Sequence, residues 1–282
     1  DKKEEALRRH MTYFATLCRT VLEDDGRRSD GSQRLLVDYP NIVVAFETAL
    51  QVGDLDIAGV TVSALLKVLA NKGPYAQSVV FAEQYLAEAK GQERFRARVF
   101  CFWLKAQRHL TSVAGQEEHL VEVLEWARQA DDFYAEIECR RIGLQMSGDR
   151  GDYDRVPVGI EDALARCKEQ RQEQYSFYFY NMYADYYLDR GETALALQMI
   201  ERAADVVRTH QLGVHLGTIA HKRGRIHEDQ GRLTEARRAY EQSLGMRRRT
   251  KFQPILGALV CNCANSVTYS SGSMSGIVAI IW

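Results

Sequence analysis

The sequence contains few residues that interrupt helices. Only 4 of its 282 residues are proline, and its 20 glycines stand mostly between amphipathic runs. Chains that form β-sandwiches or β-barrels place many more turn residues between short strands. The sequence therefore predicts an all-α fold in which short turns join the helices.

Long apolar runs are lacking as well. The apolar stretch "MSGIVAIIW" at residues 274–282 is much shorter than the roughly 20 residues that cross a bilayer. We expect no membrane span and no membrane partner.

No charge of one sign predominates. The chain has 37 Lys and Arg residues against 38 Asp and Glu residues, a formal net charge of -1. Balanced charge gives no overall attraction to nucleic acid or to anionic lipid. The basic run at residues 246–251 is assigned to a helix end, where the helix dipole favours cations. Direct binding of nucleic acid is not expected.

Motifs that carry catalytic chemistry are missing. The sequence has no phosphate-binding Gly-x-x-x-x-Gly-Lys-Ser/Thr, no Gly-x-Gly-x-x-Gly, no Gly-x-Ser-x-Gly and no His-Glu-x-x-His. We therefore predict no cofactor and no enzymatic activity. An enzyme that uses His221 with Asp185 or Glu228 is kept as an alternative.

The six cysteines do not form a recognisable metal site. None belongs to a Cys-x-x-Cys pair, and a zinc site needs four converging ligands. We predict no metal site and expect buried, reduced thiols, which indicates the cytoplasm. The cysteines are Cys18, Cys101, Cys139, Cys167, Cys261 and Cys263.

The sequence repeats itself with a spacing of about forty residues. Gly231 follows a small residue, Gly224, and precedes Ala236 and Tyr240 on the next run. The same order of small, glycine and apolar residues recurs around Gly191, and more weakly around Gly151 and Gly115. Each unit is predicted to be two antiparallel helices, the second beginning within two residues of the glycine. Stacked pairs bury the face that one pair leaves exposed, in a right-handed superhelix.

These units resemble the tetratricopeptide repeat. The frame is present at residues 217–250 and 177–210 and is weaker at 137–170 and 101–134. The usual tryptophan is absent, Arg248 stands where the repeat closes with proline, and Val156 and Pro157 replace a small residue. The resemblance implies a concave groove lined by the first helices.

Residues 34–89 resemble the segment that begins the helical-repeat region of bacterial STAND-class NTPase regulators. The stretch has an acidic-x-x-Asn-aliphatic opening, an Ala-Leu pair, a Gly-Asp turn and a later glycine. The residues at these places are Asp38, Asn41, Ile42, Ala49, Leu50, Gly53, Asp54 and Gly73. The resemblance implies a sensor or partner-binding arm that follows an NTPase module absent from this chain.

Four segments are expected from these patterns. Residues 1–30 form a leading helix, and 31–100 form the N-terminal helical pairs of the STAND-type region. Residues 101–250 form the tetratricopeptide-like repeats, and 251–282 form a partial repeat or capping helix with an apolar tail. Because the chain begins at Asp1 rather than methionine, we expect it to be part of a longer protein.

The candidate binding residues come from the groove positions that the repeat resemblance implies. They favour a peptide, a protein or a small effector as the ligand, because donors recur along the groove. The competing interpretation is that these side chains are solvated or paired within the repeats. The candidates are Lys105, His109, Glu138, Arg141, Gln145, Tyr178, Asn181, Asp185, Asp189, His221, Arg225, Glu228 and Asp229.

The function that these observations predict is a non-catalytic interaction and sensor domain of a regulatory NTPase. His109 stands where the repeat family's carboxylate clamp has an asparagine, so an acidic C-terminal tail is disfavoured as the ligand. The alternative is a self-association scaffold, with residues 277–282 as a contact.

Overall fold

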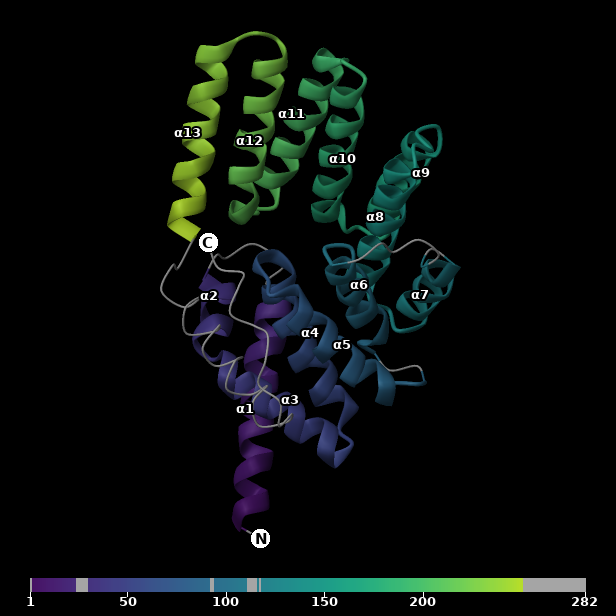
Figure 1. Ribbon diagram of the computed structural model, residues 1–282, viewed down its shortest axis with the longest axis vertical. Coiled ribbons are helices and arrows are strands. Elements are labelled where there is room, and N and C mark those ends of the chain that lie inside the picture. The colour runs from purple at the N-terminus through teal and green to yellow at the C-terminus, as the bar shows by residue number, and fades with distance from the viewer. Residues whose placement is uncertain (1, 24–29, 92–93, 111–115, 117, 251–282) are drawn as a thin grey trace, which may run out of the picture. The chain divides into compact units, whose positions relative to one another are not determined.

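The computed structural model describes residues 2–23, 30–91, 94–110, 116 and 118–250. Thirteen α-helices make up most of this part of the chain, and it contains no strand (Figure 1), as the all-α prediction requires. The helices are α1 (Lys2–Glu23), α2 (Asp30–Val37), α3 (Tyr39–Val52), α4 (Leu55–Lys72), α5 (Tyr75–Glu88), α6 (Arg96–Gln107), α7 (Glu118–Gln129), α8 (Phe133–Asp149), α9 (Arg155–Glu169), α10 (Ser176–Asp189), α11 (Thr193–Thr209), α12 (Leu216–Asp229) and α13 (Leu233–Thr250).

The N-terminal helices pack around α4, which contacts α1, α3, α5 and α6. The turn between α3 and α4 has a clear local cause. Gly53 ends α3 in the left-handed conformation, with φ of 75°, and the Asp54 side chain caps α4 by accepting a hydrogen bond from the backbone N–H of Ile57 at 2.9 Å. The Gly-Asp pair noted in the sequence is therefore a helix-turn-helix junction.

Four successive helix pairs follow: α6 with α7, α8 with α9, α10 with α11, and α12 with α13. Each pair overlaps one of the four frames predicted from the sequence and begins one to five residues before it. The expected segment boundary after residue 100 falls inside α6. Residues 251–282, including Cys261, Cys263 and the apolar tail, lie outside the described residues.

A backbone reversal recurs every twenty residues and sets the period. Positive φ values occur at positions 131, 151, 171, 191, 211 and 231, between 51° and 79°. After each of these residues, the next backbone N–H donates to the carbonyl five residues earlier, at 2.8–2.9 Å. This is the Schellman arrangement that ends a helix. The glycines at 151, 191 and 231 were predicted as turns, whereas the turns at Asp131, Arg171 and Gln211 were not.

One turn differs from the prediction. The second helix begins two residues after Gly191 and Gly231, but four residues after Gly151, at Arg155. Residues 152–154 form an additional turn, in which the Arg155 N–H donates to the Asp152 carbonyl at 3.3 Å. The statement that each second helix begins within two residues is therefore wrong for the α8–α9 pair.

Two of the pairs are close because one helix lacks a side chain at the point of contact. A Cβ atom on Gly224 of α12 would lie 2.5 Å from the Tyr240 ring on α13. In the α8–α9 pair the sizes are reversed. Leu144 occupies the position equivalent to Gly224, and Gly159 on α9 gives it room, because a Cβ atom on Gly159 would lie 2.4 Å from the Leu144 side chain. This reversal explains why the frame at 137–170 looks weak in sequence.

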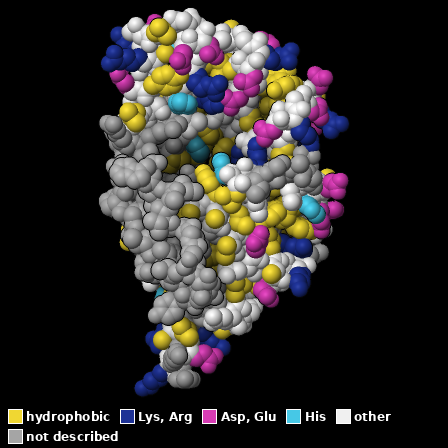
Figure 2. Space-filling model, viewed as in Figure 1, with side chains coloured by type: hydrophobic (Ala, Val, Ile, Leu, Met, Phe, Trp, Pro, Cys, Tyr) yellow, Lys and Arg dark blue, Asp and Glu magenta, His cyan; other side chains and the backbone are white. Residues whose placement is uncertain are grey.

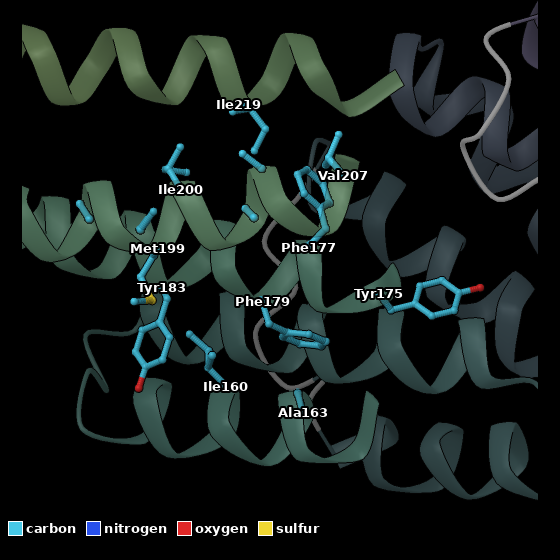
Figure 3. Close-up of a cluster of buried hydrophobic side chains, with 14 of the residues drawn as sticks. Ile160, Ala163, Tyr175, Phe177, Phe179, Tyr183, Met199, Ile200, Val207 and Ile219 are labelled. Atoms are coloured by element: carbon cyan, nitrogen blue, oxygen red, sulfur yellow. The ribbon is translucent and has the colours of Figure 1, made fainter. Parts of the chain in front are cut away.

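The aromatic helix α10 is buried on two sides rather than along one stripe. Phe177 points towards Val207 and Ile219, and Phe179 points towards Ala163 on α9 (Figure 3). The helical spacing of residues 174–187 predicts one packing stripe of Phe177, Tyr180, Tyr183, Ala184 and Tyr187. This prediction is correct for Phe177, Tyr183 and Ala184, all buried. It is wrong in leaving out Phe179, which is fully buried, and in including Tyr180 and Tyr187, which are only partly buried. A helix between two neighbours must bury residues that face each of them.

Replacing Gly224 by alanine is expected to lower the free energy of unfolding by about 1–2 kcal/mol. The gain of up to about 1 kcal/mol in helix propensity is smaller than the cost of overpacking against Tyr240. Gly245 is the matched control, because a Cβ there would meet nothing within 4 Å, and Gly245→Ala should stabilise. Urea unfolding followed by circular dichroism measures both, and equal effects at the two glycines would contradict the packing argument.

Candidate partner-binding face

Side chains connect each first helix to the next. Arg108, at the end of α6, donates to the Gln145 side chain on α8 at 2.9 Å. Tyr178 on α10 is close enough to Tyr134 on α8 to contribute to the raised pKa of Tyr134. Arg225 on α12 donates to Asp185 on α10 at 3.3 Å. We call the surface formed by these side chains of α6, α8, α10 and α12 the first-helix face.

The centre of this face is a buried group of charges. Arg141 donates to both oxygens of Glu138, at 3.1 and 2.6 Å, and their side chains are only 12% and 5% exposed. Burial raises the pKa of Glu138, but the charge and hydrogen bonds of Arg141, with help from Lys105, outweigh burial and lower it. Burial lowers the pKa of Lys105. Lys105 and Arg141, predicted from different repeats, therefore act on one carboxylate.

Tyrosine side chains extend this group towards α10. Tyr134 lies beside Glu138, and burial together with that carboxylate raises its pKa well above the ordinary value. Tyr178 packs edge-on to His215, with ring centroids 5.6 Å apart. Burial lowers the pKa of His215 to about 4, and the nearby Lys67 contributes. His215 is therefore neutral near pH 7 and serves as an aromatic packing surface for Tyr178.

A second charged group joins α10 to α12. Asp185 accepts hydrogen bonds from Lys222 and from Arg225. Lys222 is largely covered, with 13% of its side chain exposed, whereas Arg225 and Asp185 remain about two-fifths exposed. Asp185 and Arg225 are therefore paired, but between neighbouring repeats, whereas the competing interpretation predicts pairing within a repeat.

Asn181 lies between Tyr178 and Asp185 in the α10 sequence. Its side-chain oxygen Oδ1 is buried and has no hydrogen-bond partner among the described residues. An acceptor left without a donor costs roughly 1–3 kcal/mol.

The remaining predicted residues are not gathered into one site. His109 stacks on Tyr75 of α5, with ring centroids 4.1 Å apart, and His221 packs against Tyr240, with centroids 5.4 Å apart. Gln145 is engaged by Arg108, and Asp189 and Asp229 are exposed.

Three contributors to the face were missed in sequence: Tyr134, Arg108 and Lys222. Tyr134 precedes the repeat frame, because α8 begins at Phe133 rather than at residue 137. Arg108 precedes the predicted residue His109 and Lys222 follows the predicted residue His221, so no single shift of the frame would have found both.

The groups proposed for the enzyme alternative have other partners. Glu228 accepts a hydrogen bond from Tyr240 at 2.6 Å, and Asp185 is held by Lys222 and Arg225. Cys139, which precedes two arginines, is 3% exposed and its thiol donates to the Leu120 carbonyl at 3.2 Å. In the part of the chain that the structure describes, no three His, Cys, Asp or Glu residues are placed to hold a metal ion.

The buried cysteines behave as core residues. Cys18, Cys101, Cys139 and Cys167 are buried, and none forms a disulfide among the described residues. Burial raises the pKa of Cys18 and of Cys167 to about 12. The prediction of buried, unpaired thiols is confirmed for these four.

Charged side chains of both signs are mixed on the surface, as the balanced numbers of basic and acidic residues predict. Over α10 to α13, basic and acidic side chains are interspersed on the face shown in Figure 2. No described helix combines the length and the apolar composition needed to cross a membrane.

Replacing Arg141 by methionine is expected to cost about 3 kcal/mol of unfolding free energy, because Glu138 then stays buried without its bidentate partner. The double variant Glu138→Leu/Arg141→Met removes both charges and should recover about half of that loss. Urea unfolding at pH 7 measures both, and an equal loss in the single and double variants would contradict the pairing.

The Glu138–Arg141 pair predicts that the free energy of unfolding depends on pH. The pKa of Glu138 is lowered below its ordinary 4.5 in the folded chain, so its contribution to stability is present above about pH 4.5. This contribution is lost as the pH falls through the lowered value. The stability of the double variant, measured from pH 5 to pH 3, should therefore fall less than that of the parent chain.

Comparison with known proteins shows similarity in fold. No family model and no curated protein matches the sequence. The chain is similar to the crystal structure of BtubC (BKLC) from P. vanneervenii, with a TM-score of 0.50 and 14% sequence identity over 98% of both chains. At this identity the similarity extends to the helical fold alone.

Proposed function

We propose that this chain is a non-catalytic interaction domain that binds a peptide or protein along the first-helix face. The observation that carries the proposal is that Tyr178, Asn181 and Asp185 lie along α10 and are all partly exposed. This arrangement offers an amide group beside an aromatic surface and a charged pair. Tyrosine is frequent at binding hot spots, because it gives contact area and a hydroxyl at low entropic cost.

The backbone repeat supports a continuous binding surface. Reversals every twenty residues return every second helix to the same side, so α6, α8, α10 and α12 contribute equivalent positions. The resemblance to the tetratricopeptide repeat supports a right-handed superhelix, in which this side is concave. An extended segment would then contact several repeats at once.

The buried charge pairs support this role by fixing the surface in advance. Arg141 and Lys222 are held by Glu138 and Asp185, so their side chains lose little additional freedom when a ligand binds. Such preorganisation lowers the entropic cost of binding.

In this proposal the domain adjoins an NTPase module in a longer parent chain, because residues 34–89 resemble STAND-class regulators. Binding at the first-helix face would be passed to that module. A small effector is the second ligand class that the face would accept. The unpaired cysteines fit a reducing compartment, so the proposal places the domain in the cytoplasm.

A displayed random-peptide library, selected on the immobilised full chain, tests the binding role. Selected peptides should bind the variant Tyr178→Ala/Asn181→Ala at least tenfold more weakly, because the aromatic surface and the acceptor are removed. The variant Tyr153→Ala/Asn41→Ala, changed at the same residue types on exposed sites elsewhere, should bind as the parent does. Peptides that lose affinity equally for both variants would contradict a site on this face.

One observation favours self-association as a second candidate. Helix α13 exposes Leu233 (68%) and Leu244 (49%) on either side of a cavity of about 350 Å³. Light scattering separates the two functions, since the scaffold requires a stable oligomer without ligand.

A further inference from the structure

A second surface, formed by other residues than the first-helix face, combines aromatic side chains with acidic ones. Hydrophobic side chains gather over the region of α5 and α6 on the face shown in Figure 2. We call this surface the aromatic patch and define it by Val80, Glu83, Phe100, Trp103, His119 and Trp126, from α5, α6 and α7.

Direct contacts make the patch continuous across the three helices. The Trp103 indole donates to Glu83 of α5 at 3.2 Å. The Phe100 ring lies 5.2 Å from Trp103 and 6.1 Å from Trp126 of α7, measured between centroids. His119 lies 6.2 Å from Phe100. Two of the three tryptophans in the chain thus stand in one partly exposed cluster.

The aromatic patch is held in place by an arginine that contacts one of its tryptophans. The Arg96 guanidinium lies over the Trp126 ring, 3.7 Å from its centroid, and donates to the carbonyls of Lys90 and Gly91 at 3.2 and 2.8 Å. This cation–π contact fixes the indole. Arg96 lines the same cavity as Glu122 and Glu125 but makes no ion pair with either of them.

The charges that remain at the edge of the patch are mainly acidic. Glu122 and Glu125 of α7 line a cavity of about 270 Å³ beside Trp126. Both are exposed, and neither makes an ion pair with any described residue. Glu83 is exposed on the α5 side, and Lys90 is the one lysine lining that cavity.

We propose that the aromatic patch docks a basic amphipathic helix of a partner protein. Its apolar side would cover Phe100, Trp103 and Trp126, and its lysines or arginines would pair with Glu122 and Glu125. Hydrophobic burial supplies the affinity, and charge complementarity selects a basic segment over an acidic one. This surface is distinct from the first-helix face, so the two would bind different partners.

Two synthetic helical peptides test the proposal on the full chain. One is a 14-residue amphipathic peptide of leucine and lysine, and the other has glutamate in place of every lysine. Isothermal titration should give at least tenfold tighter binding of the lysine peptide. Tryptophan emission should shift on binding, because Trp103 and Trp126 become covered.

Charge-reversed variants locate the site. Glu122→Lys/Glu125→Lys should bind the lysine peptide at least tenfold more weakly, and its circular dichroism spectrum should match that of the parent. The control Asp205→Lys/Glu235→Lys makes the same charge change on exposed residues of α11 and α13 and should leave binding unchanged. Variant Tyr178→Ala/Asn181→Ala should also bind normally, which separates this surface from the proposed peptide site.

Several results would overturn the inference. Equal affinity for the lysine and glutamate peptides would show that the patch does not select a basic helix. A loss of binding as large in the control as in Glu122→Lys/Glu125→Lys would show that overall charge, not this site, attracts the peptide. Absence of binding at millimolar peptide would exclude the docking role.

Discussion

The hydrogen-bonded reversal that occurs every twenty residues is the constraint on which the rest of this chain depends. Each reversal ends a helix in the left-handed conformation and returns the next helix antiparallel to it. With helices of 14–17 residues in the regular units α10 to α12, equivalent positions recur forty residues apart. The first helices can then be linked by side chains such as Asp185 and Arg225 only because this period is kept.

Within that period, close packing is achieved by complementary sizes rather than by a fixed residue. Gly224 faces Tyr240 in one pair, while Leu144 faces Gly159 in another. The space between two helix axes must be filled by one side chain, and that side chain can come from either helix. The helix pair is therefore kept where the sequence frame is weak, although α8 and α9 pack less closely than α10 and α11.

This explains which parts of the fold and of the candidate site could be predicted from the sequence. Glycine at 191 and 231 marks turns directly, because the left-handed backbone conformation favours glycine. The intervening turns at Arg171 and Gln211 escaped prediction, because their side chains carry no such signal and only the backbone shows the conformation. Lys105 and Arg141 were identified by position, but their shared partner depends on how α6 and α8 are placed, which periodicity alone does not determine.

The distribution of charge follows from the same geometry and bears on function. Where first helices lie side by side, charges such as Arg141 and Glu138 are desolvated and must pair with one another. Where α5 and α7 flank α6, Glu122 and Glu125 have no described counterpart and stay exposed beside tryptophan. Paired charges fix the shape of a surface, while unpaired charges beside apolar area are free to select a partner. A helical-repeat domain can thus present two surfaces of different character on one scaffold.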